Sequence, residues 1–234
     1  MKVDIFVIDF DSTFVSYESL ALMVEIALKK HPKKRKISLR WEAIGNINMK
    51  SEIDFKSSLK MKIEALRGVL TEEHLTRVGK ILEKEISPDI VKIVKLAKNT
   101  NKKVISVSNS FKFCMKEVMK KYGVEIYFAN KHFTDKKGFV IGYDETNPMA
   151  NNDGKSNVIR FLKNVGIIMP EDKIMMIGDG MSDLKVYQDG LCDYFMDFSI
   201  NKNRKLKKHK AEDDKNFFIC RKSEDVDAVL KVIE

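Results

Sequence analysis

Two aspartates, Asp9 and Asp11, stand one residue apart directly after an apolar run at residues 3–8. Such a run is typical of a buried β-strand, and ligands of open α/β sheets bind beyond the carboxyl ends of the strands. The pair therefore occupies a position where a sheet presents reactive groups. A turn or a solvated strand end is the alternative for an isolated pair of this kind.

Three further polar groups could complement the two aspartates. Ser108 follows a second apolar run, Lys155 precedes a segment of helical periodicity, and the Gly-Asp-Gly-Met-Ser-Asp stretch at 178–183 follows another apolar run. Each group is common by itself. Four compatible groups, each just past an expected strand or before an expected helix, point to one site.

These residue types suit phosphoryl transfer with an aspartate as the nucleophile. A carboxylate that approaches a phosphate needs a divalent cation, a fixed positive charge and oriented N–H or O–H donors. We expect Asp9 to attack phosphorus, and Asp11 to protonate the leaving oxygen and later to activate water. Asp11 would continue in the same extended direction as Asp9. Ser108 would bind a phosphate oxygen, and Lys155 would neutralise charge.

The acids at 178–183 favour a metal site beside the nucleophile. Mg²⁺ prefers an oxygen-rich, partly hydrated shell, which Asp9 and Asp179 would supply together with Asp183, directly or through water. Gly178 and Gly180 would let the backbone turn tightly and approach the metal. Calcium binding or a plain turn is the alternative for this loop.

The composition is that of a folded protein with a basic charge balance. A chain of 234 residues that is 44% hydrophobic is long enough for a large domain with a smaller inserted one. The net charge of +9 suits nucleic acid, an anionic membrane surface or small anionic substrates. Basic runs at 29–36 and 202–210 are expected to be solvated loops, because no aromatic residues are interleaved to stack on bases.

The cysteines and the hydropathy of the chain indicate which kinds of site and which cellular location to expect. The three cysteines are widely separated, which argues against structural zinc and a disulfide framework. No window approaches the ~20 apolar residues of a membrane span. We expect a cytoplasmic monomer or homodimer that acts on a small phosphorylated metabolite, without membrane or nucleic-acid partners.

Apolar runs alternate with helical periodicity, which predicts a Rossmann-like, doubly wound α/β core with a mainly parallel sheet. The expected strands are 3–8, 103–107, 126–128, 173–177, 194–198 and 217–219, and the helices among them include 113–122 and 156–165. A hairpin is expected at 133–143.

Roughly 95 residues separate the first two expected strands, far more than a crossover needs. They are expected to form helices at 17–29, 39–47, 51–66 and 71–85. We therefore predict a helical cap at 14–84, inserted into an α/β core made of 1–13 and 85–234.

The motifs resemble those of a known superfamily. Asp9-Phe10-Asp11-Ser12-Thr13, Ser108, Lys155 and Gly178-Asp179-Gly180 are similar to the four motifs of the haloacid dehalogenase superfamily, and the first motif resembles its phosphoserine phosphatases. The resemblance implies hydrolysis of O-phospho-L-serine through an aspartyl-phosphate. It also implies Mg²⁺ bound by Asp9, by the main-chain carbonyl of Asp11 and by Asp179.

The resemblance extends to the expected cap. It implies that Glu18 receives the substrate ammonium and that Met49 and Phe55 line the pocket. Lys62 stands where the family has an arginine that grips the substrate carboxylate, and lysine offers a mobile point charge instead of a planar fork. Exposed helix positions, or core positions for Met49 and Phe55, are the alternatives.

Two departures lie near the phosphate and the metal. Asn109 replaces a glycine of the family, and Ser182 stands where the family has asparagine or threonine. These departures leave the phosphatase chemistry intact and open a second hypothesis, the same chemistry on another small phosphate ester. A third hypothesis, a basic nucleic-acid-binding or scaffold protein on a non-catalytic core, is opposed by the complete set of motif residues.

Overall fold

The computed structural model describes residues 1–50, 52–201 and 214–233, and for Met49 it describes the backbone only. Within these residues, six parallel strands form one sheet in the order β3-β2-β1-β6-β7-β8. The strands are β1 (Ile5–Ile8), β2 (Lys103–Phe111), β3 (Ile126–Asn130), β6 (Ile174–Gly178), β7 (Tyr194–Phe198) and β8 (Phe217–Cys220). The predicted doubly wound α/β fold is confirmed.

The strand β1 lies in the middle of the sheet and is buried along its whole length. Ile5 and Val7 pack into the core on one face of the sheet, whereas Phe6 and Ile8 belong to the core on the other face. This alternation follows from the period of two residues in a strand. It explains why the sequence of β1 is uninterruptedly apolar.

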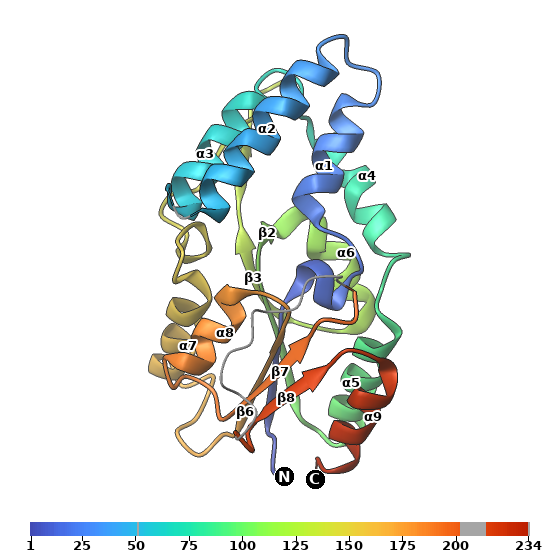
Figure 1. The fold of residues 1–234 in the computed structure, drawn as a ribbon, viewed down its shortest axis with the longest axis vertical. Helices are drawn as coiled ribbons and strands as arrows, with labels where there is room; N and C mark the ends of the chain where they lie inside the picture. Colours follow the sequence, from blue (N-terminus) through green and yellow to red (C-terminus); the bar gives the residue numbers. More distant parts are fainter. Residues whose placement is uncertain (51, 202–213, 234) are drawn as a thin grey trace.

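Helices cover both faces of the sheet (Figure 1). The helices α7 (Gly154–Asn164) and α8 (Met181–Gln188) cover one face, and α5 (Pro88–Asn99), α6 (Lys112–Tyr122) and α9 (Ser223–Lys231) cover the other.

The boundary residues of β2 differ from the prediction, because the strand continues through Ser108 to Phe111 with a shifted register against β3. Ser108 therefore lies within the end of a strand rather than after it.

Four helices between β1 and α5 lie at the end of the molecule beyond the carboxyl ends of the strands (Figure 1). They are α1 (Ser19–Leu28), α2 (Lys34–Met49), α3 (Phe55–Ala65) and α4 (Glu72–Leu82), called here the helical segment. Within it α2 packs against α3, and α4 packs against α1 and against α6 of the core. The helical segment thus touches the core beside the strand ends.

The basic run at 29–36 is a loop only in its first part. The helix α2 begins at Lys34, five residues before the predicted start, so the loop prediction is wrong for Lys34, Arg35 and Lys36. Lysine and arginine are good helix formers, which allows α2 to extend into the run. The other basic run, 202–210, and Ser51 of a predicted helix start lie outside the described residues.

The predicted hairpin is present as β4 (His132–Thr134) and β5 (Val140–Tyr143), paired antiparallel. Its turn is closed by the Asp135 carboxylate, which accepts hydrogen bonds from the backbone N–H groups of Lys137 and Phe139, each at 2.9 Å. The Tyr143 hydroxyl donates to the Lys56 carbonyl of α3 at 2.9 Å. The hairpin therefore supports the helical segment.

In the described part of the chain, every helix is too short or too polar to cross a membrane.

Candidate active site

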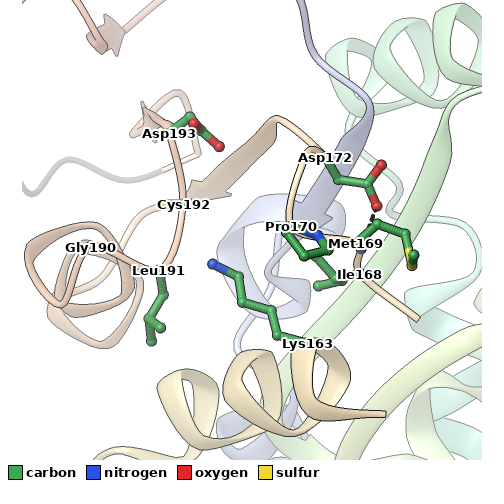
Figure 2. A pocket seen from close by; sticks show the side chains of 9 residues that line it. All are labelled: Lys163, Ile168, Met169, Pro170, Asp172, Gly190, Leu191, Cys192 and Asp193. Carbon is green, nitrogen blue, oxygen red and sulfur yellow. Dashed lines mark hydrogen bonds between the residues drawn. The ribbon is translucent and has the colours of Figure 1, made fainter. Parts of the chain in front are cut away.

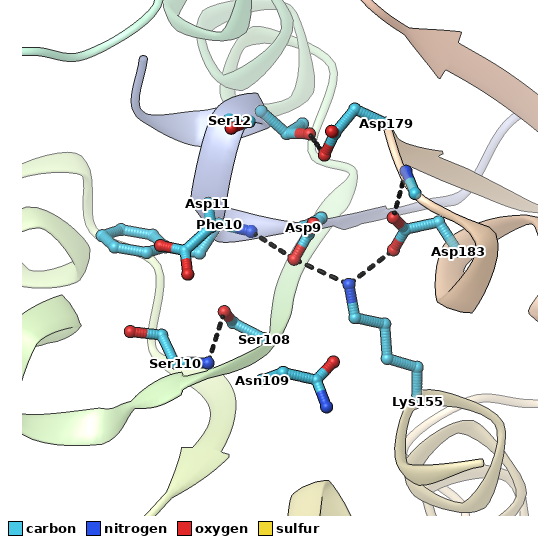
Figure 3. A network of polar contacts seen from close by, with 12 residues as sticks. Asp9, Phe10, Asp11, Ser12, Ser108, Asn109, Ser110, Lys155, Asp179 and Asp183 are labelled. Atoms are coloured by element: carbon cyan, nitrogen blue, oxygen red, sulfur yellow. Dashed lines mark hydrogen bonds and ion pairs between the residues drawn. The ribbon is translucent and has the colours of Figure 1, made fainter. Parts of the chain in front are cut away.

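The site lies where β1, β2 and β6 end. The backbone N–H of Asp9 donates to the Ile177 carbonyl of β6 at 2.9 Å, and Ile8 is in register with Ser106 of β2. Because the three strands are parallel and adjacent, their carboxyl ends meet at one edge of the sheet. Asp9, Ser108 and Asp179 are therefore brought together from distant parts of the sequence, as Figure 3 shows.

Three buried carboxylates form the centre of the site. Asp9, Asp179 and Asp183 each offer one oxygen, and these oxygens all lie within 4.8 Å of one another. The Lys155 ammonium lies between two of them, 2.7 Å from Asp9 Oδ1 and 2.6 Å from Asp183 Oδ1 (Figure 3). Only 3% of Lys155 and none of Asp183 is exposed. Buried charges of this kind are tolerated only when they are paired and hydrogen-bonded.

The electrostatics of the site follow from burial and from the excess of acids. Burial raises the pKa of Asp9 well above its usual range, the charge of Asp183 adds to this, and Lys155 acts in the opposite direction. Burial alone would lower the pKa of Lys155, but the charges of Asp183 and Asp9 outweigh it and raise the pKa. Lys155 thus stays a cation, and the surrounding acids still favour additional positive charge.

Gly178 is required by the side chain of Asp183. The Asp183 Oδ2 atom accepts a hydrogen bond from the Gly180 N–H at 3.0 Å, and a methyl group at position 178 would collide with the Asp183 carboxylate. Neither glycine has a positive φ, although the chain bends at residues 179 and 180, between β6 and α8. Gly178 lets the Asp183 carboxylate lie against the backbone.

The backbone at Asp11 is extended, with φ −67° and ψ 133°, as it is at Asp9. The chain turns after it, where Ser12 lies in the left-handed region at φ 56°. The Asp11 carboxylate accepts hydrogen bonds from Ser19, at 3.1 Å from the backbone N–H and 2.8 Å from the hydroxyl. Burial, with the charge of Glu18, raises the pKa of Asp11 to about 7. The carboxylates of Asp9 and Asp11 therefore have different hydrogen-bond partners.

The side chains at the end of β2 are tied to neighbouring backbone. Ser108 Oγ accepts a hydrogen bond from the Ser110 N–H at 3.0 Å, and the Asn109 amide donates to the Met149 carbonyl at 3.1 Å. Asn130 of β3 donates to the Asn109 carbonyl at 2.8 Å. The Asn109 side chain is thus held by the backbone of the loop that contains Met149.

The predicted substrate-binding residues Glu18, Lys62, Phe55 and Ser182 have contacts of their own outside the Lys155 network. Glu18 is exposed and accepts a hydrogen bond from the Ser12 hydroxyl at 2.7 Å. Lys62 is half-buried, burial lowers its pKa, and the charge of Glu18 opposes this shift. Phe55 and Ser182 line an open cleft of about 580 Å³ together with Asn109. The side chain of Met49 lies outside the described part of the structure.

Comparison with known proteins identifies the family. Residues 6–188 match the family of haloacid dehalogenase-like hydrolases. The chain belongs to this family. Among its relatives are phosphoserine phosphatases from Bos taurus, 28% identical over 70% of this chain and 71% of the relative, and from Campylobacter jejuni subsp. doylei, 25% identical over 78% and 82%. This haloacid dehalogenase-like hydrolase is therefore similar to phosphoserine phosphatases, as the motifs indicate.

Solved structures show the same fold. A substrate-bound phosphoserine phosphatase complex covers all of both chains with a TM-score of 0.75 and 19% identity. A phosphoserine phosphohydrolase-like protein from Francisella tularensis covers 98% of this chain and 99% of its own with a TM-score of 0.74 and 23% identity. Because the similarity spans whole chains, it includes both the sheet and the helical segment.

Three polar contacts of this hydrolase escaped the sequence-based reasoning. Thr13 donates its hydroxyl hydrogen to Asp179 Oδ1 at 3.2 Å, Ser19 holds Asp11, and the Ser19 and Ser110 hydroxyls share a hydrogen bond. Because Thr13 lies in the first motif, the sequence could have indicated that its hydroxyl contacts the site. Ser19 and Ser110 carry no such signal, because their partners are set by how the helical segment meets β2.

A second cavity, shown in Figure 2, lies at the amino ends of β6 and β7, opposite to the carboxyl ends at which the site lies. It has a volume of about 290 Å³ and is lined by residues that precede β6 and β7, among them Lys163, Asp172 and Cys192. Burial raises the pKa of the Cys192 thiol to about 12, so this cysteine stays protonated at neutral pH. The cavity lacks the carboxylates and the lysine of the family motifs and is not the candidate active site.

Proposed function

We propose that this protein is a Mg²⁺-dependent phosphomonoesterase that hydrolyses O-phospho-L-serine to L-serine and phosphate. The observation that most supports it is the buried Lys155 ammonium between Asp9 and Asp183, with Asp179 alongside, at the carboxyl edge of the sheet. This arrangement combines a nucleophile, a fixed cation and metal-ligand oxygens in one place. Phosphoryl transfer requires this combination.

The donor set fits Mg²⁺. The three carboxylates are buried and close together, and all their donor atoms are oxygens, the ligand type that hard divalent cations prefer. We assign Asp9, Asp179 and Asp183 to the metal, together with the main-chain carbonyl of Asp11. Bound Mg²⁺ would supply positive charge that offsets the repulsion between Asp9 and the phosphate.

In the proposed reaction, a carboxylate oxygen of Asp9 attacks phosphorus and the ester P–O bond breaks. The leaving serine oxygen takes the proton of the Asp11 carboxyl group, and Asp9 becomes an aspartyl-phosphate. The ionised Asp11 then removes a proton from water, which attacks phosphorus and releases phosphate and free Asp9. Lys155 and Ser108 bind the phosphate oxygens throughout.

Asp11 is suited to the acid and base role by its surroundings. Its two carboxylate oxygens are held by the Ser19 N–H and hydroxyl, so the group has a defined orientation. Its partners differ from those of Asp9, whose carboxylate contacts Lys155 and the Phe10 N–H. Two aspartates with different partners can perform different tasks in one reaction.

We propose that residues 14–84 act as a cap that selects the leaving group. Glu18 and Lys62 carry opposite charges and influence each other electrostatically, which suits a leaving group with an ammonium and a carboxylate. Phe55 and Ser182 would line the cleft toward Asn109. The phosphoserine phosphatases among the relatives support this choice of substrate.

A second candidate keeps the chemistry and changes the ester. Lys62 replaces the arginine that the resemblance implies, and Asn109 adds a side chain beside the phosphate site. The cleft of about 580 Å³ next to Asn109 also has room for a leaving group larger than serine. Both features favour testing other small phosphorylated metabolites.

The test is phosphate release by the 234-residue protein with Mg²⁺ from a panel of esters. The panel contains phosphoserine, phosphothreonine, phosphoethanolamine, glycerol phosphate and p-nitrophenyl phosphate, and kcat/KM is measured for each. We expect the highest value for phosphoserine. A higher value for another natural ester would transfer the assignment to the second candidate, and no release from any ester would contradict both.

A further inference from the structure

The ammonium of Lys62 lies over an indole ring. Lys62 Nζ is 5.1 Å from the ring centroid of Trp41, within the range of a cation–π interaction, for which tryptophan is the most effective ring. Trp41 is buried on α2, with 9% of its surface exposed. A buried ring cannot follow a moving side chain, so it holds the ammonium at one place.

The backbone around Lys62 leaves room for its ammonium. Gly45 follows Trp41 by four residues on α2 and so lies on the same face of that helix. A methyl group built at Gly45 would lie 4.0 Å from Lys62 Nζ, whereas a larger side chain would compete for the same space. Trp41 and Gly45 together shape the place that the ammonium occupies.

Burial lowers the pKa of Lys62, and two features of its surroundings oppose this shift. Lys62 lies in the last turn of α3, where the helix dipole favours a cation. Glu18 also favours the charged form. Among the residues that the structure describes, no carboxylate lies within ion-pair distance, 4.0 Å, of Lys62 Nζ. The cation is therefore oriented by a ring and remains able to bind an anion.

We infer that Trp41 is a positioning residue that fixes Lys62 for the carboxylate of the leaving group. This inference rests on the proposed function and adds the requirement that the leaving group carries a carboxylate. A lysine ammonium is a mobile point charge with three N–H donors. The indole face takes up one side of it, so the remaining donors are directed toward the substrate. The ring thereby supplies part of the preorganisation that a planar guanidinium fork has by itself.

The first test compares two esters that differ by the carboxylate. Phosphoserine and phosphoethanolamine share the phosphate and the ammonium, and the ratio of their kcat/KM values reports recognition of the carboxylate. In Trp41→Leu the ratio should fall roughly two- to thirtyfold, mainly because KM for phosphoserine rises. In Trp41→Phe it should fall less, because the phenyl ring still makes a cation–π interaction, although a weaker one. Ile44→Ala, which removes another buried side chain from α2, is the matched control and should keep the wild-type ratio.

The outcomes separate the inference from the proposed function. If wild-type protein uses phosphoserine no better than phosphoethanolamine, the proposed substrate is wrong. If the wild type prefers phosphoserine and both Trp41 variants keep that preference, the positioning role is wrong and the substrate stands. Trp41→Phe keeps the test decisive should Trp41→Leu fail to fold, which circular dichroism would reveal.

A second readout does not depend on turnover. Trp41 is the only tryptophan in the chain, so its fluorescence reports this place alone. In the Asp9→Asn variant with Mg²⁺, saturation with phosphoserine should change the tryptophan emission more than saturation with phosphoethanolamine, and Lys62→Met should abolish the difference. Equal responses to both esters, at concentrations where calorimetry shows binding, would overturn the inference.

Discussion

The carboxylate centre and the helical segment differ in how firmly their polar residues are held. Lys155 is almost fully buried and contacts Asp9 and Asp183 at 2.7 and 2.6 Å. Glu18 is exposed, and Lys62 is half-buried with a ring rather than a carboxylate as its contact. A dense buried network tolerates little change, whereas a looser pair of charges can be replaced with smaller cost. In the proposed function, reaction chemistry and substrate choice therefore depend on different parts of the fold.

The largest effect is expected at Asp9, the proposed nucleophile. Asp9→Asn keeps the shape of the side chain but replaces a carboxylate by an amide, a poor nucleophile. We expect kcat to fall by roughly 10³-fold or more, because covalent catalysis is lost. Phosphate release measures this, and near-native circular dichroism is the control. A variant within tenfold of the wild type would contradict covalent catalysis by Asp9.

Removal of the metal should have the next largest effect. We expect chelation by EDTA to abolish phosphate release and added Mg²⁺ to restore it, because the buried acids need compensating charge. Asp179→Asn should raise the Mg²⁺ concentration for half-maximal activity by at least roughly 10- to 100-fold, because loss of even an outer-shell partner of a metal ligand has an effect of this size.

The matched control for the metal experiment is Asp172→Asn. Asp172 lies by the cavity at the amino ends of β6 and β7 and accepts a hydrogen bond from the Met169 N–H. This variant should keep the wild-type Mg²⁺ dependence. Full activity of the wild type in excess EDTA would rule out the metal-dependent mechanism.

An intermediate effect is expected at Gly178, which tests the tightness of the core site directly. In Gly178→Ala the new methyl group meets the Asp183 carboxylate, which must shift from the position in which it contacts Lys155. Overpacking of this kind costs about 1–3 kcal/mol of stability, and activity should fall with it. Thermal unfolding and phosphate release measure the two effects. Gly142→Ala, where a methyl group meets nothing within 4 Å, is the control.

The smallest effect is expected in the helical segment. Lys62→Met should raise KM for phosphoserine roughly 3- to 30-fold with little change in kcat, because a single partly exposed charge contact is lost. Lys62→Arg should preserve or improve phosphoserine use, since a fork binds a carboxylate with two hydrogen bonds. A large loss of kcat in Lys62→Met would show that the helical segment takes part in the chemistry and would remove the contrast between the two regions.

Much of the fold follows from local sequence pattern. The six strands were predicted with approximate limits because uninterrupted apolar runs are typical of strands buried on both faces. The start of α2 was misjudged because Lys34 to Lys36 suit both an exposed loop and an exposed helix. The extension of β2 through Ser108 was missed because polar residues ordinarily signal the end of a strand.

The core of the candidate site follows from sequence for a related reason. Asp9, Ser108 and Asp179 come at the ends of expected parallel strands, and parallel strands present their carboxyl ends at one edge. The hydrogen-bond partner of the Asp11 side chain does not follow, because a turn with Ser12 in the left-handed region brings Ser19 of the first helix to the Asp11 carboxylate. A contact made by the residues after the motif cannot be derived from the motif.

The sequence by itself determined the order of strands and helices, the proposed nucleophile Asp9 and the set of acids around it. These features depend on short-range sequence pattern. In a parallel sheet, residues at the carboxyl ends of neighbouring strands lie close together, so the pattern also indicates which residues meet. Only the tertiary structure decided that Gly178 makes room for Asp183, that Ser19 holds Asp11 and that Trp41 faces Lys62. These contacts join separate elements, and their geometry depends on how helices pack against each other and against the strand ends.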